Sequence, residues 1–267
     1  MNYLPLGILL NRSALFLRRV QLTLNLSIPA LLSPEALVRF NRWSYRRRFS
    51  KWAVEMPAAG LFPWEKQIIE TRSVPSGGRI LVLFCGGGRD AIGLAKLGYK
   101  VSAVDFVPEF VEKAKENARA AGVEVEFSVQ DSSRADFPPE TFDAAVAFCF
   151  TYSCVPGRRN RVEMLRRVQA ALKPRGIALV TFCNNRLEPN EVRLHRFLAR
   201  IARVIGNGEY ELGDTIHANV EYSHYFQDEQ AVVSEAVDAG FEDASLDAFW
   251  PGGALAVLRR KSPFDDL

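Results

Sequence analysis

Residues 79–98 read RILVLFCGGGRDAIGLAKLG, an apolar run followed by three glycines and a second apolar pattern. The run at 79–84 predicts a short buried strand, and the pattern at 88–98 predicts a helix that ends at a glycine. Each glycine gives up conformational freedom on folding, so three in a row indicate a close approach to the main chain. Where a strand turns into a helix, free N–H groups favour a polar or anionic part of a ligand.

The chain after this turn alternates between strand and helix patterns. Strands are predicted over 99–106, 123–131, 142–150 and 176–183, and helices over 107–122 and 158–173. Alternation at this spacing predicts a parallel sheet with helices on both faces. A helix that ends near Gly240 and two more strands follow, and only the WPGG of residues 250–253 separates these strands. So short a link predicts an antiparallel pair at the sheet edge.

A carboxylate stands at the end of the second predicted strand, because Asp105 follows Gly88 by 17 residues. An acid there can accept hydrogen bonds from both hydroxyls of an adenosine ribose. Each feature alone has a plain structural interpretation, a tight turn for the glycines and a helix cap for the aspartate. Together they predict an adenosine-bearing cofactor. Residues 86–91, GGGRDA, also fit the G-x-G-x-x-A dinucleotide fingerprint, so the loop alone leaves an NAD-dependent oxidoreductase open.

Four segments carry a family resemblance. Residues 80–106 combine the glycine loop with the acid-ended second strand, and residues 129–148 (VQDSSRADFPPETFDAAVAF) place an aspartate before the fourth strand. Residues 172–182 (LKPRGIALVTF) hold the fifth strand, and residues 224–241 (HYFQDEQAVVSEAVDAGF) precede the final strands. In this order and spacing, residues 62–260 resemble the class I S-adenosylmethionine-dependent methyltransferases, whose final antiparallel pair is foreign to the dinucleotide fold.

The resemblance implies an α/β, Rossmann-like fold: a seven-stranded mixed sheet with the last strand antiparallel and helices on both faces. It implies S-adenosylmethionine as the cofactor. Gly86 and Gly88 would run under the methionine part, Asp105 would hold the ribose, and Asp131 and Ser132 would face the adenine. The full set of expected cofactor-binding residues is Cys85, Gly86, Gly87, Gly88, Asp90, Asp105, Phe106, Asp131, Ser132 and Phe148.

The methionine end of the expected pocket departs from the family pattern. The main chain near Phe148 and Cys149 would line the sulfonium. The family usually has an acid two residues before its first loop glycine, and the positions before the loop here hold Val82 and Phe84. Asp90 or a residue of the N-terminal segment could compensate. A non-catalytic, methyltransferase-like binding or scaffold protein is therefore the main alternative to an enzyme.

The chemistry expected from the resemblance is an in-line displacement at an activated methyl group, which needs alignment more than acid–base catalysis. A base helps when the acceptor is a hydroxyl or a protonated amine. Residues 184–225 form the expected substrate-side insertion, and His224 is the expected base. The expected substrate-binding residues are Tyr45, Asn184, Tyr222 and Tyr225. For each of these the alternative is a cap or packing role.

Other acceptor classes are disfavoured by what the sequence lacks. Neither an NPPY signature nor a cluster of metal ligands of catechol type is present, so DNA-base and metal-dependent methylation are not expected. We expect no metal site and a methyl transfer to an oxygen or nitrogen of a small molecule, which could be lipophilic. The oligomeric state has no signal in the sequence.

The first 60 residues differ from the remainder in composition and charge. Residues 1–52 hold nine Lys and Arg and one acid, giving +8 in a chain of net charge +3. Residues 33–56 predict a helix with Ser33 as its cap, whereas VQLTLNL at 20–26 alternates as a strand would, in surroundings that suit a helix. We therefore predict a helical arm or lid over 1–60 and a cofactor-binding domain over 61–267.

The arm has three possible roles. It could be a lid that packs Trp43, Phe49 and Trp52 over the cofactor cleft, with Tyr45 covering the cofactor, which we favour. It could lie on anionic lipid, helped by the apolar 4–17 stretch. Binding of RNA by its arginines and aromatics is disfavoured, because one short cluster is a weak signal.

The cysteines and the start of the chain indicate a cytoplasmic protein, with peripheral membrane contact left open. Cys85, Cys149, Cys154 and Cys183 show no CxxC spacing, so free thiols are expected rather than disulfides or a zinc site. The longest apolar runs are too short to span a bilayer, which needs about 18 residues or more. The apolar start has no early basic region, so it does not read as a secretory signal.

Overall fold

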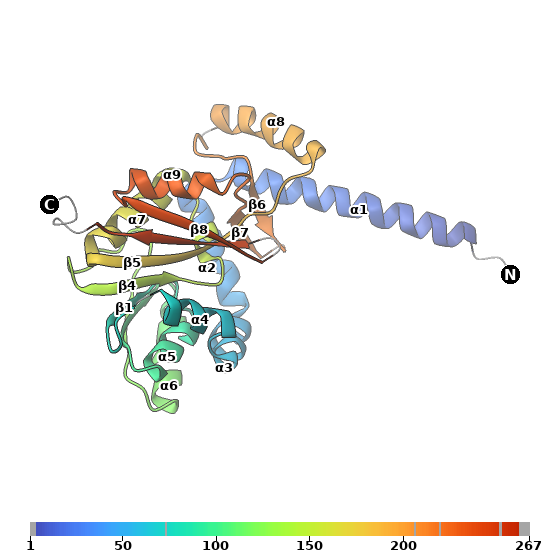
Figure 1. The fold of residues 1–267 in the computed structure, drawn as a ribbon. Coiled ribbons are helices and arrows are strands. Elements are labelled where there is room, and N and C mark those ends of the chain that lie inside the picture. The colour runs from blue at the N-terminus through green and yellow to red at the C-terminus, as the bar shows by residue number, and fades with distance from the viewer. Residues whose placement is uncertain (1–3, 73, 206, 219, 251–252, 262–267) are drawn as a thin grey trace.

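The structure is a computed structural model, and it describes every residue except 1–3, 73, 206, 219, 251–252 and 262–267. Its centre is a seven-stranded sheet of order β3-β2-β1-β4-β5-β9-β8 (Figure 1). The strands are β1 (Arg79–Val82), β2 (Lys100–Asp105), β3 (Glu126–Val129), β4 (Phe142–Ala147), β5 (Leu172–Cys183), β8 (Asp243–Trp250) and β9 (Gly253–Arg259).

The strand directions confirm the predicted mixed sheet. β1 to β5 pair in parallel, and β9 is antiparallel to both β5 and β8. The predicted tight link between the last two strands falls on residues 251–252, outside the described residues.

Helices cover both faces of the sheet, as the alternation predicts (Figure 1). Ile80 and Val82 of β1 point to one face and Leu81 to the other, because successive residues of a strand alternate in direction. On the first face lie α4 (Pro63–Thr71) and α5 (Arg89–Lys96), with α6 (Pro108–Ala120) next to α5; on the second lie α7 (Arg158–Ala171) and α9 (Gln230–Asp238).

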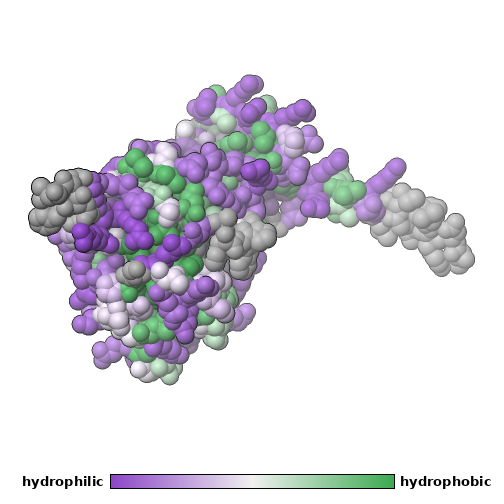
Figure 2. Space-filling view, viewed as in Figure 1, coloured by the Kyte–Doolittle hydropathy of each residue, from purple (hydrophilic) through white to green (hydrophobic). Residues whose placement is uncertain are grey.

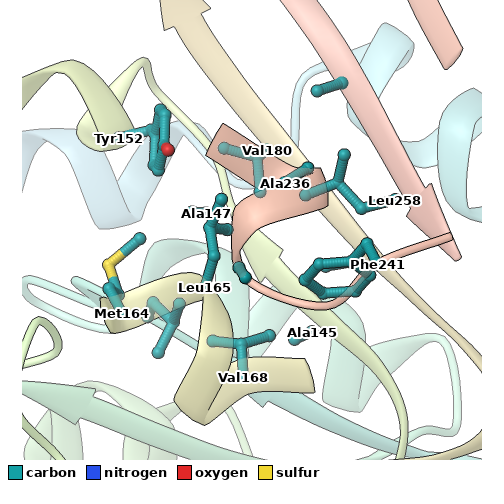
Figure 3. Close-up of a cluster of buried hydrophobic side chains, with 14 of the residues drawn as sticks. Ala145, Ala147, Tyr152, Met164, Leu165, Val168, Val180, Ala236, Phe241 and Leu258 are labelled. Carbon is teal, nitrogen blue, oxygen red and sulfur yellow. The ribbon is translucent and has the colours of Figure 1, made fainter. Parts of the chain in front are cut away.

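Figure 3 shows the cluster on the second face. Ala145 and Ala147 of β4 lie opposite Leu165 and Val168 of α7, and Ala236 of α9 closes the other side. Small side chains on the central strand let the helices approach closely, as dense packing requires. This packing fixes the carboxyl end of β4 next to the carboxyl end of β1, its parallel neighbour in the sheet.

The N-terminal segment is mostly helical in its described part, with a break at Leu32 and Ser33. It comprises α1 (Leu4–Leu31), α2 (Pro34–Arg47), a π-helical turn η1 (Ser50–Glu55) and α3 (Met56–Ala59). The alternating residues 20–26 belong to α1, so the helical alternative holds there. Ser33 caps α2 as predicted, and its Oγ accepts a hydrogen bond of 3.3 Å from the Ala36 N–H. Figure 1 shows most of α1 projecting away from the rest of the molecule.

The insertion after β5 packs against this segment. It contains α8 (Pro189–Ile205) and a hairpin of β6 (Asp214–His217) and β7 (Glu221–His224). Leu26 of α1 shares a buried cluster with Leu198 of α8, and Leu37 of α2 shares another with Tyr222 of β7. Two segments far apart in the sequence therefore form one unit beside the sheet. Within the described part of the chain, no helix is both long and apolar enough to cross a membrane.

Candidate functional site

A cavity opens beyond the carboxyl ends of β1, β2 and β4. It holds about 780 Å³ of space free of protein atoms, including the solvent at its mouth. One wall comes from the loops after these strands, a second from α2 and η1, and a third from the hairpin and the short helix η2 (Thr151–Cys154). Parallel α/β sheets bind ligands at this edge, where the strand order reverses between β1 and β4.

The three loop glycines have different neighbours, and of the three Gly86 lines the cavity. A Cβ at Gly87 would lie 2.6 Å from the Cα of Ala53, and the Gly87 N–H donates to the Trp52 carbonyl at 3.2 Å. Gly88 has φ +90° and faces apolar side chains. The close approach that excludes a side chain at 87 is therefore the protein's own arm rather than a ligand.

Asp105 lies in the wall beside the loop and is buried. Its Oδ2 accepts a hydrogen bond of 2.9 Å from the Gly86 N–H, and its Oδ1 accepts one of 2.9 Å from the Val107 N–H. Burial outweighs these bonds and raises the pKa of Asp105 to about 6. A carboxylate that lines a cavity with a raised pKa is poised to gain donors from a ligand.

Asp131 and Phe106 also line the cavity. Asp131 Oδ1 accepts hydrogen bonds from the N–H and the Oγ of Ser133, at 3.0 and 2.7 Å. The ring of Phe106 meets Tyr45 edge to face, with centroids 6.2 Å apart. Ser132 is buried and does not contribute to the wall; its Oγ accepts the Phe84 N–H at 3.1 Å.

Three expected cofactor residues point elsewhere. Asp90 receives a hydrogen bond of 2.6 Å from Arg89, which also pairs with the buried Glu65 of α4. Burial raises the pKa of Glu65 to about 7. Cys85 is buried beneath the loop, and Phe148 packs edge to face on Trp64. These three side chains are buried between the sheet and its helices, and they do not line the cavity at the carboxyl ends of the strands.

Two residues that follow strands are held in unusual conformations at the cavity. Phe84 and Cys149 have φ of +54°, and both line the wall. Positive φ is rare outside glycine and tends to occur at ligand sites. Phe84 occupies one of the positions where the family has an acid, while Val82 is buried in the sheet, so this end of the cavity is apolar.

The expected residues of the insertion do not reach the cavity wall. His224 Nδ1 lies 2.8 Å from Asp214 Oδ1, and the Tyr222 hydroxyl donates to the same oxygen at 2.8 Å. Tyr225 pairs with His217, and Asn184 pairs with Glu229. These contacts fix the hairpin and its junction with β5, so the placement of His224 does not suit the role of a base in the cavity.

Glu221 lines the cavity instead, and the sequence analysis missed it. It accepts a hydrogen bond from Tyr45, and burial raises its pKa. Residues of a strand alternate in direction, so Tyr222 and His224 share one face of β7 and Glu221 takes the other. The sequence EYSH at 221–224 gives this alternation only if the segment is known to be a strand.

The arm supplies part of the wall through Tyr45 and Trp52. The indole Nε1 of Trp52 is buried, and it has no hydrogen-bond partner among the described residues. Phe49 packs against Phe110 with ring centroids 5.8 Å apart. Trp43 differs from the expectation: it is 55% exposed and lies against Phe40 and Arg47, on the outer side of α2.

Comparison with known proteins gives a domain family. A family model described as a methyltransferase domain matches residues 80–176. The chain is 30% identical over 161 residues to the ubiquinone biosynthesis O-methyltransferase of Xanthomonas euvesicatoria pv. vesicatoria (strain 85-10), a match over 58% of this chain and 59% of that protein. It is 32% identical over 116 residues to the putative methyltransferase YqeM of Bacillus subtilis (strain 168), over 43% and 46%. The matches thus span about three fifths or less of these relatives.

Solved structures share the fold. A SAM-dependent methyltransferase from Methanosarcina mazei superposes with a TM-score of 0.58 at 22% identity, over 76% of this chain and 99% of that one. A TehB-like SAM-dependent methyltransferase from Corynebacterium glutamicum ATCC 13032 Kitasato gives 0.53 at 20% identity, over 82% and 98%.

Proposed function

This chain contains a class I S-adenosylmethionine-dependent methyltransferase domain, and from that premise we propose that it transfers a methyl group to an oxygen or nitrogen of a small molecule. The observation that carries the proposal is the pairing of Gly86 and Asp105. A glycine, which has no side chain, and a buried carboxylate lie side by side in one cavity wall, at the switch point of the sheet.

The residues of the cavity fit the proposed cofactor. Asp105 would accept the ribose hydroxyls, Asp131 would accept the adenine amine, and Gly86 would leave room for the methionine chain. The Nε1–H of Trp52, which has no partner among the residues that the structure describes, offers a further donor to a polar ligand group. S-adenosylmethionine supplies a methyl group that is already activated on a sulfonium. Because the wall carries Tyr45 and Trp52, the arm would help to exclude water from it.

The acceptor end of the cavity carries Glu221, Tyr45 and two thiols. Glu221 can take a proton from a hydroxyl or amine acceptor, and Tyr45 holds its carboxylate by a hydrogen bond. Burial raises the pKa of both Cys149 and Cys154, so neither thiol is ionised at neutral pH. They would not compete with the acceptor for the methyl group, because the thiolate is the reactive form.

Binding of the cofactor is the first test. Calorimetry of the full chain should give saturable binding of S-adenosylmethionine and of S-adenosylhomocysteine, and no heat of binding with NADH. If neither S-adenosylmethionine nor S-adenosylhomocysteine binds, the scaffold alternative is favoured. The apolar Phe84, which stands where the family has an acid, is the feature that points to this alternative. Binding of NADH alone would favour the oxidoreductase.

The affinity for S-adenosylhomocysteine should fall as the pH falls through about 6. Burial raises the pKa of Asp105 from 3.8 to about 6, and the ribose hydroxyls need its ionised form as an acceptor. Each pH unit below the pKa should then weaken binding by up to about tenfold. We expect a Kd about tenfold higher at pH 5 than at pH 7 in calorimetry. A constant Kd across this range would contradict a contact between Asp105 and the ligand.

A further inference from the structure

Two adjacent helices at one end of the molecule expose apolar and basic side chains together. Figure 1 shows α8 lying next to the base of α1, and the two helices are joined by the buried cluster of Leu26, Ala30, Leu198 and Ala202. Tyr210 packs on the same joint and β6 packs on α1, whereas residues 11–24 of α1 and the outer face of α8 stay exposed. In Figure 2 hydrophobic and hydrophilic residues are interleaved over both of them.

The described outer part of α1 is exposed on every side. All residues from Asn11 to Leu24 are exposed, although half of them are apolar. Phe16 and Leu17 are 66% and 64% exposed. Neighbouring exposed apolar side chains of this size commonly mark a surface that binds a protein or a lipid bilayer. The described residues of this chain do not cover the outer part of α1, so we expect a partner outside the chain to contact it.

The outer face of α8 repeats the pattern. Phe197 and Val204 are 58% and 86% exposed, and they lie seven residues apart, two helical turns, on the same face. Arg193 and Arg200 share that face, while His195 on the opposite side is buried. Each large apolar group therefore stands next to a guanidinium.

The charge of this surface is mostly positive. Residues 11–24 of α1 carry three arginines and no acid, and α8 carries four arginines and a single acid, Glu191, in its first turn. Seven guanidinium groups on two neighbouring helices attract an anionic partner, and the interleaved apolar groups need a non-aqueous one.

We propose that α1 and α8 together dock this protein onto the surface of an anionic phospholipid bilayer, with Phe16, Phe197 and Val204 entering the acyl boundary and the arginines contacting headgroup phosphates. A second copy of this chain is a poorer occupant, because it would bring a second set of arginines against the first. A nucleic acid would satisfy the arginines and leave the aliphatic groups in water. This inference is independent of the proposed function.

Vesicle co-sedimentation of the full chain tests the inference. Vesicles of phosphatidylcholine with phosphatidylglycerol should pellet the protein, pure phosphatidylcholine should pellet much less, and added salt should release it. Phe16→Asp should weaken binding about tenfold or more, because it replaces an apolar side chain that the bilayer would bury. The triple change Arg196→Gln, Arg200→Gln and Arg203→Gln should weaken it about a hundredfold, since each arginine near such a surface contributes about fivefold.

Matched controls lie elsewhere on the molecule. Val237→Asp on α9 replaces another exposed apolar side chain, one that is 58% exposed, and Arg119→Gln on α6 removes another exposed arginine. Both should pellet as the unchanged protein does, and the thermal midpoint of every variant shows whether it folds. Equal pelleting with both vesicle types, or equal loss in test and control variants, would overturn the inference. So would a dimer in sedimentation velocity that Phe16→Asp dissociates without any vesicle binding, or binding to a nucleic-acid duplex in place of vesicles.

Discussion

Replacing Asp105 by alanine is expected to weaken binding of S-adenosylhomocysteine a hundredfold or more. The ionised carboxylate would accept the two ribose hydroxyls, and a hydrogen bond to a charged group is worth about 1.5–3 kcal/mol. Losing both removes about 3 kcal/mol or more, which is a factor of about a hundred in Kd. The same change frees the Gly86 and Val107 N–H groups that Asp105 now binds, so the loop itself loses its anchor.

Two further variants make this result specific. Asp105→Asn has nearly the same shape and does not titrate, so its Kd should be raised and should no longer change between pH 5 and 7. Glu221→Gln alters the same cavity at the acceptor end and should leave the Kd within about threefold of the original, because Glu221 is not expected to touch the cofactor. Calorimetry gives the Kd, and circular dichroism reports folding. Unchanged binding in a folded Asp105→Ala protein would refute the assigned role.

Gly87→Ala is expected to lower the free energy of unfolding by about 3 kcal/mol. The new Cβ would lie 2.6 Å from both the Cα and the carbonyl oxygen of Ala53, and 2.7 Å from Cγ of Pro57. Two of these atoms are main chain, which cannot move aside as a flexible side chain does. Overpacking in a close-packed interior costs about 1–3 kcal/mol, and the broken bond between the Gly87 N–H and the Trp52 carbonyl adds to it.

Urea denaturation measures the change, and Gly122→Ala is its matched control. Gly122 has φ +68° and its Cβ would meet no atom within 4 Å, so alanine there adds backbone strain of about 1 kcal/mol without a clash. Limited proteolysis of residues 1–60 should also be faster in Gly87→Ala, because the arm is pushed off the loop. The close packing of arm and loop would be refuted if the two variants had the same stability and the same cleavage rate.

The sheet was predictable because its signals are local and repeated. Each buried strand of the core is a short apolar run, and Gly98 and Gly122 mark helix ends in the sequence as they do in the structure. The alternating residues 20–26 were less informative. The residues of α1 described as buried lie at its end, at Leu26, Pro29 and Ala30, whereas residues 20–24 are exposed, so the alternation at 20–26 carries no burial signal.

The site was predictable where it follows from the strand ends and not where it depends on distant packing. Gly86, Asp105 and Asp131 line one cavity, as strand ends of one sheet edge should. Their roles toward a cofactor remain predictions. The choice between His224 and Glu221 depended on which face of β7 meets the cavity. Contacts with α2 hold β7 there, such as the bond from the Tyr222 N–H to Asn41 Oδ1, and no local pattern encodes a contact between segments roughly 180 residues apart.

The contact between α1 and α8 also has a consequence for synthesis. Leu198 leaves the ribosome roughly 170 residues after Leu26, its partner in the buried cluster, and translation proceeds at about 5–20 residues per second. For about ten to thirty seconds Leu26 of α1 is therefore without its α8 partner. Contacts of such long sequence separation form late, so a chaperone or a nearby bilayer has first access to this helix.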